Sequence, residues 1–125
     1  MTIIYTTAVK TERMTAVRDL IDVAAGNGAI EIGTAGMGTV LAVIPLDAIS
    51  GTISGSILTF SSFPKSDSSA DATGTAAEAR IIDGISTNII TGLTVGTSAS
   101  DIVLDSLSIT TGQVVTLDSA TITHA

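Results

Sequence analysis

The chain has 125 residues, of which 45% are hydrophobic and 2% aromatic, and its formal net charge is -7 at pH 7. This length fits one domain with a core of its own. With so few aromatic residues the core must consist of Ile, Val, Leu and Ala, and branched side chains favour sheets. Negative charge repels nucleic-acid phosphates and anionic lipid headgroups, which argues against nucleic acid and membrane as partners. The chain has no cysteine, so disulfides and thiolate chemistry are excluded.

Neither a signal peptide nor a membrane span is predicted. The first residues lack a charged region followed by an apolar one. The longest apolar run, residues 40–46, is too short to cross a bilayer. The sequence therefore predicts synthesis in a cytoplasm.

The N-terminal part has the period of a helix. Residues 1–7 are predicted to form an extended arm, and residues 8–25 to form a helix that Thr6 or Thr7 caps. Gly26 stands where a left-handed residue ends a helix. The apolar residues predicted to share one face of this helix, with Met14 beside them, are Val9, Val17, Leu20, Ile21 and Ala24.

Beyond Gly28 the pattern changes to the alternation of strands. Residues 76–83 and 86–95 predict a hairpin, and a long last strand over residues 113–123 predicts a bulge near Leu117 or Ile122. Short strands with turns at roughly ten-residue spacing indicate a mainly β fold. We expect a single domain over residues 1–125, in which residues 29–125 form a β-sandwich or small, jelly-roll-like barrel and the helix covers one face or an open end.

The residues that usually carry chemistry do not combine into a site. His124 is the only histidine and lies next to the C-terminus, where chain ends are usually mobile. Asp67 and Asp71 fall in the Ser-rich stretch 61–74, whose oxygens suit Ca²⁺ but whose spacing matches no calcium loop, so a solvated loop is favoured. Asp101 and Asp105 flank residues 102–104, and in a strand their side chains fall on one face, for which an exposed surface is favoured over a catalytic site. The glycines of residues 33–38 precede an apolar strand and lack the Gly-Lys-Ser/Thr ending of a phosphate-binding loop.

We therefore expect no enzyme activity, no cofactor and no metal. A chain of Gly-rich turns and Ser/Thr-rich strands without a reactive centre is predicted to act through its surfaces and edges.

Several segments, in order and spacing, resemble a family of small virion proteins of tailed bacteriophages. Residues 57–60 (ILTF) and 70–76 (ADATGTA) resemble the "VLTF … ADATGTA" segment of that family, and residues 95–104 (VGTSASDIVL) resemble its "VGTSGADLNL". Ala79 departs from the family, which has an aromatic residue there. Further similar segments are residues 80–83, 108–109, 112–115 and 121–123.

The resemblance implies a non-enzymatic virion structural protein, foremost a capsid cement or decoration protein on the outside of the mature head. Its expected partners are the major capsid protein and its own copies, as a homotrimer, and its expected location is the virion. The alternatives are a low-copy tail or head–tail joining component and a carbohydrate-binding adhesin-like module, although sugar sites usually need the aromatic residues that this chain lacks.

Five residues are predicted to contact partners. Three of them, Ile3, Ile4 and Tyr5, belong to the arm, which either adds a strand to the sheet of a neighbour or completes its own sheet. The other two are Phe63 and Lys65, in the stretch 61–74.

Overall fold

The computed structural model describes residues 3–23 and 26–124. Within them one helix, α1 (Thr7–Val23), is followed by a short 3-10 turn, η1 (Ala35–Met37), and by strands that fill the rest of the fold. The strands are β1 (Ala29–Gly33), β2 (Val40–Pro45), β3 (Gly51–Ser54), β4 (Ile57–Phe60), β5 (Lys65–Asp67), β6 (Gly74–Thr75), β7 (Glu78–Ile82), β8 (Asn88–Gly96), β9 (Ile102–Leu104), β10 (Ser108–Ile109) and β11 (Val115–Thr123).

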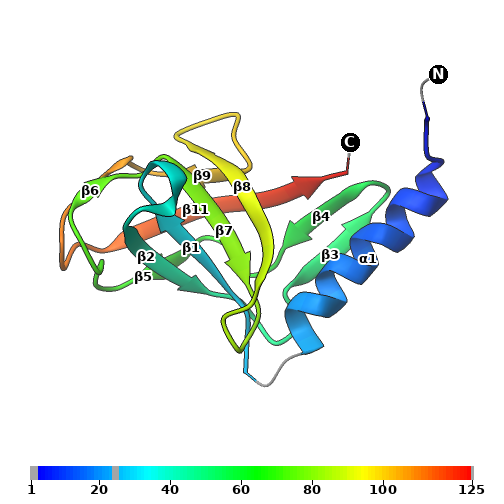
Figure 1. The fold of residues 1–125 in the computed structure, drawn as a ribbon, viewed down its shortest axis with the longest axis horizontal. Coiled ribbons are helices and arrows are strands. Elements are labelled where there is room, and N and C mark those ends of the chain that lie inside the picture. The colour runs from blue at the N-terminus through cyan, green and yellow to red at the C-terminus, as the bar shows by residue number, and fades with distance from the viewer. Residues whose placement is uncertain (1–2, 24–25, 125) are drawn as a thin grey trace.

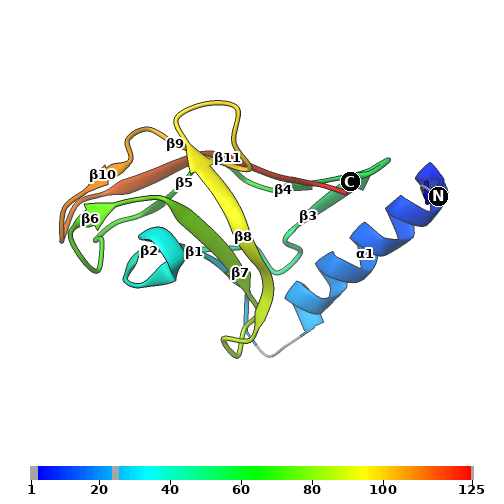
Figure 2. The ribbon, with the colours of Figure 1, turned by 45° about the horizontal axis from the view of Figure 1, so that its top comes forward.

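The main sheet has the order β2-β1-β7-β8-β9-β11-β4-β3, and β5 pairs with β11 off this path. The pair β8–β9 is parallel, whereas the other pairs are antiparallel. The sheet curls into a half-barrel at one end of the molecule. Helix α1 lies at the other end, beside the β3–β4 hairpin (Figures 1 and 2). The small β6–β10 pair lies at the end of the half-barrel that is farthest from α1 (Figure 2).

Strand β5 brings the two sides of the half-barrel together. It pairs with β11 through its backbone, with Ser66 opposite Thr116. Toward β2, the Asp67 carboxylate accepts a hydrogen bond from the Val43 amide at 3.0 Å, and the Asp71 amide donates to the Leu41 carbonyl at 2.8 Å. The short polar strand β5 therefore connects β11 with β2.

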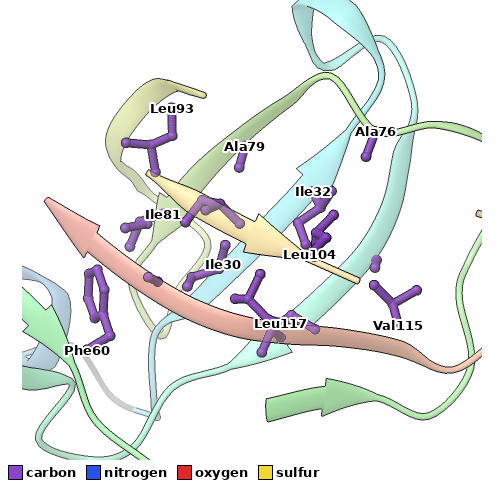
Figure 3. Close-up of a cluster of buried hydrophobic side chains, with 14 of the residues drawn as sticks. Ile30, Ile32, Phe60, Ala76, Ala79, Ile81, Leu93, Leu104, Val115 and Leu117 are labelled. Carbon is purple, nitrogen blue, oxygen red and sulfur yellow. The ribbon is translucent and has the colours of Figure 1, made fainter. Parts of the chain in front are cut away.

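The core of the half-barrel consists of aliphatic side chains that point into the space between the curled strands (Figure 3). β1 contributes Ile30 and Ile32, β7 contributes Ile81, and β11 contributes Leu117, all without exposed surface. Branched and γ-branched side chains on alternate positions fill such a pleated interior, as the composition predicted.

Helix α1 begins at a capping threonine. Thr6 Oγ1 accepts from the Val9 amide at 3.4 Å, and the Thr6 carbonyl accepts from the Lys10 amide at 3.0 Å. Gly26 has φ +86°, the left-handed value predicted for it. The capping role of Thr6 and the existence of the helix are thus confirmed.

The predicted buried face of the helix is partly wrong. Met14 and Ile21 are buried and Val17 packs at the margin of the core, but Val9 and Leu20 face solvent with 40% and 55% of their surface exposed. Ala24, also assigned to that face, lies outside the described residues. The apolar residues of this helix occupy two faces, and only one of them meets the body.

Most of the predicted β elements are confirmed. β7 and β8 form the expected hairpin, and Asp83 stabilises its turn by accepting from the Ile85 and Thr87 amides. β11 carries a bulge between Leu117 and Ser119. The mainly β fold with one N-terminal helix is confirmed, in the form of a half-barrel. The stretch 61–74, predicted as a loop, instead contains β5.

Candidate functional site

The apolar side chains that α1 and the arm expose define the candidate site. Ile3, Ile4 and Val23 have 71%, 83% and 76% of their surface exposed. The large exposed aliphatic residues outside the arm and α1, Ile49, Ile57, Ile85 and Val114, belong to separate turns and strands of the described chain. Since scattered exposed aliphatic residues are normal on a protein surface, the group on one element is the informative one.

On α1 these residues form one stripe, here called the outer face, which consists of Val9, Ala16, Leu20 and Val23. Residues three, four and seven positions apart share a side of an α-helix. The buried residues Met14 and Ile21 lie on the other side. Figure 2 shows α1 beside the hairpin, with its far side turned away from the rest of the chain.

Polar contacts hold the inner side of α1 against the body. Thr11 Oγ1 donates to the Gly55 carbonyl at 2.6 Å, and the Asp22 carboxylate accepts from the Ser50 amide at 3.2 Å. These bonds attach both halves of the helix to the β3–β4 hairpin. They fix the direction in which the outer face points.

The described part of the arm is anchored at Tyr5. Residues 3–6 form no strand, so for these residues the alternative that the arm completes its own sheet is wrong. Arg13 Cζ lies 3.9 Å from the centre of the Tyr5 ring, a cation–π contact. The Tyr5 ring also meets the His124 ring edge-on, with 6.2 Å between centroids, and the His124 amide donates to the Ser56 carbonyl. Ile3 and Ile4 therefore project from a fixed base.

A shallow hollow of about 400 Å³ lies on the N-terminal half of α1. Its lining consists of Ala8, Val9, Glu12, Arg13 and Ala16. The two alanines leave room between longer neighbours. The hollow is therefore apolar at its floor, with one acidic and one basic side chain at its margin.

Phe63 and Lys65 do not join the arm. Phe63 is half-buried and packs at the margin of the core, and Lys65 begins β5 in the half-barrel, away from the N-terminal end (Figure 1). Lys65 Nζ lies 2.6 Å from Asp47 Oδ1, and Ser62 Oγ donates to Asp47 Oδ2 at 2.5 Å. The Lys65 bond, followed by that from Ser62, lowers the pKa of Asp47. The structure thus splits the five predicted residues into two groups, and their contact roles stay predictions.

Two carboxylates that lie in or directly before a strand, Asp67 and Asp101, accept hydrogen bonds within the fold. Asp67 is one of the two carboxylates considered for a Ca²⁺ site. One of its oxygens accepts a hydrogen bond from the Val43 amide and the other accepts one from the Ser69 amide. Asp101 accepts from the amide and the hydroxyl of Thr94. Across residues 3–23 and 26–124, no three His, Asp or Glu side chains gather as a metal site would need.

Asp105 and Asp118 form a pair of exposed carboxyl groups that lie close together. Asp118, at the bulge of β11, shares a hydrogen bond with Asp105, which follows β9, and this bond raises the pKa of Asp118. A raised pKa means that Asp118 keeps its proton to a higher pH than an isolated carboxyl group would.

The described part of the chain contains no helix that is long and apolar enough to cross a membrane. Comparison of the chain with protein-family models, curated proteins and solved structures produced no match. Sequence reasoning placed two residues of the outer face, Val9 and Leu20, on one face together with Val17 and Ile21. The seven-residue spacing of Val9, Ala16 and Val23, separate from that of Met14 and Ile21, is the signal that distinguishes the two faces.

Proposed function

We propose that this chain is a non-enzymatic structural protein of a tailed-bacteriophage virion, a capsid cement or decoration protein that binds the outside of the mature head. Its partners in this proposal are the major capsid protein and two further copies of itself. The resemblance of the sequence supplies the class of protein. The observation that carries the proposal is the apolar surface that the arm and the outer face of α1 leave uncovered.

Physical reasoning favours such a role for a surface of this kind. A protein that binds only the assembled shell stabilises it by mass action. Weak contacts repeated over many copies become strong through multivalency, so no single copy needs a large cluster of Trp, Tyr and Arg. The chain has one Tyr and no Trp. A rigid half-barrel that presents a small apolar surface meets these needs.

The use of the polar side chains supports a binding role over catalysis. Asp22, Asp67, Asp83 and Asp101 accept bonds from backbone amides of turns, strands and the helix contact. A carboxylate held in this way orders the chain rather than a substrate. Binding is then the function that the exposed apolar residues serve.

The copy number per purified particle tests the assignment. Quantitative mass spectrometry measures this protein against the major capsid protein. A ratio close to that of the capsid protein supports a cement protein on the whole shell. A few copies per particle assign it to the tail or the head–tail junction, and its absence from particles contradicts every virion role and leaves the adhesin-like module.

The arm has its own test within this proposal. We expect a variant with Ile3→Ser and Ile4→Ser to occupy purified heads at a clearly lower copy number, because two exposed aliphatic contacts are lost. A control variant with Ile49→Ser and Ile85→Ser removes equally exposed side chains from other parts of the chain. Equal occupancy by both variants would show that the arm does not contact the capsid.

A further inference from the structure

We infer that copies of this chain associate through the outer face of α1, with the helices parallel and side by side around a three-fold axis. The number of copies rests on the homotrimer of the proposed function. The docking surface itself is argued from the described residues of α1. The occupant of this surface is thus a second copy of the same helix.

The spacing of the outer face suits helix pairing. Val9, Ala16 and Val23 recur every seven residues, and Leu20 lies between the last two. A seven-residue apolar repeat keeps one seam of a helix turned toward a partner helix. From Val9 to Val23 the seam runs about 21 Å along the axis, at the usual rise of 1.5 Å per residue. It covers nearly the whole of α1.

The hollow on α1 has the pattern of a helix-packing site. Four of its five lining residues, Val9, Glu12, Arg13 and Ala16, stand at positions i, i+3, i+4 and i+7. Four residues of this kind form the hole that receives one side chain of a facing helix. Ala16 at one corner keeps the hole open and allows two helices to approach closely. The hollow therefore has the shape to receive a side chain that projects from another helix.

The charges on either side of the outer face select the orientation. Glu12 and Asp19 lie on one flank, and Arg13 lies on the other. Around an axis parallel to the helices, the acidic flank of one copy meets the basic flank of the next, with Glu12 and Arg13 at nearly the same height. In an antiparallel two-fold pair like flanks meet, which sets Glu12 against Asp19 of the other copy. Charge complementarity favours the parallel arrangement.

Within one chain these charges are available for such a contact. Among the described residues neither Glu12 nor Arg13 belongs to an ion pair. The Tyr5 ring holds the Arg13 guanidinium in place from the arm side. A side chain that is already ordered loses less entropy on pairing, so Arg13 is prepared for a carboxylate of a neighbouring copy.

The mass of the isolated protein in solution tests the association. Light scattering on a size-exclusion column is expected to give three times the mass of one chain for the wild type and the mass of one chain for Leu20→Glu. The control Ile85→Glu changes a residue of the β7–β8 turn that is at least as exposed as Leu20, and this variant is expected to remain trimeric. Circular dichroism checks that both variants are folded. A wild type that is monomeric at every concentration, or a folded Leu20→Glu trimer, overturns the inference.

Introduced cysteines test the orientation, since the natural chain contains none. Under oxidation, parallel helices allow Val9→Cys to cross-link with itself, and Val23→Cys to do the same. Cross-linking only in a mixture of the two variants indicates antiparallel helices and overturns the parallel arrangement, and Ile85→Cys serves as the uncross-linked control. These results concern the isolated protein, so they are independent of the copy number on particles that tests the proposed function.

Discussion

The half-barrel and α1 bury their side chains to very different extents. In the half-barrel, Ile32, Leu41 and Leu117 on three separate strands have no exposed surface. In α1, which has 17 residues, only Met14 and Ile21 are buried. The helix keeps its place through polar bonds to the hairpin and leaves a second apolar face outside. Stability is therefore concentrated in the half-barrel, whereas α1 is the element that has surface to offer a partner.

The largest contrast is expected from matched leucine truncations. Leu117→Ala removes a fully buried side chain and leaves a cavity, which should lower the free energy of unfolding by about 2–5 kcal/mol. Leu20→Ala removes a side chain with 55% of its surface exposed and should change this free energy by less than about 0.5 kcal/mol. Urea unfolding of the dilute monomer measures both. Equal losses would show that α1 belongs to the same cooperative core.

The next largest loss of unfolding free energy is expected when the Asp67 carboxylate, which connects β5 with β2, is removed. Asp67→Ala removes the acceptor of the Val43 and Ser69 amides and should cost about 1.5–3 kcal/mol, the range for hydrogen bonds to a charged group. Asp71→Ala is the matched control, because Asp71 contributes its backbone amide to the contact with β2. Urea unfolding of the two variants compares them. A loss as large for Asp71→Ala would mean that charge, and not the hydrogen bonds of Asp67, matters here.

A smaller effect is expected in the hairpin under α1. A methyl group on Gly51 would lie 3.0 Å from Phe60 Cα and closer still to the Thr59 carbonyl. Gly51→Ala should therefore destabilise the chain by about 1–3 kcal/mol through overpacking. Gly38→Ala is the control, since Gly38 has φ −60° and a methyl group there meets nothing closer than 3.5 Å. Thermal unfolding that ranks the two variants the other way would contradict this packing of β3 on β4.

Two exposed carboxylates should respond to pH with opposite signs. The bonds from Lys65 and Ser62 lower the pKa of Asp47, so its contribution to stability is present above the ordinary value of 3.8 and is lost as pH falls through the lowered pKa. The bond with Asp105 raises the pKa of Asp118, so the folded state loses stability as pH rises from 3.8 through the raised pKa.

At about pH 7, Asp47→Asn should therefore lower the melting temperature and Asp118→Asn should raise it slightly. Toward about pH 3 the difference for Asp118 should fade, because its raised pKa leaves this carboxyl group protonated there, whereas the difference for Asp47 should persist until the pH falls through its lowered pKa. Melting curves at the two pH values measure this. Differences of the same sign for both variants would contradict the assigned pKa directions.

The sequence was sufficient to predict the elements whose local and tertiary preferences agree. Alternation and a turn signal gave the β7–β8 hairpin, and a threonine before an apolar period gave the start of α1. It was insufficient where tertiary contacts decide. β5 has the sequence Lys-Ser-Asp, which has little strand preference, and it is a strand because β11 and the Asp67 bonds hold it. Val9 and Leu20 were predicted to share a face with Ile21 because two apolar stripes on one helix look alike in sequence.

The solvent accessibility of the Leu20 side chain in the associated protein tests most directly whether the outer face of α1 is a contact surface. Hydroxyl-radical footprinting at increasing protein concentration measures it, with Ile85 as the internal reference. We expect oxidation of Leu20 and Val9 to fall as concentration rises, while oxidation of Ile85 stays constant. If Leu20 remains as reactive as Ile85 at every concentration, the outer face of α1 is not where copies of this chain meet.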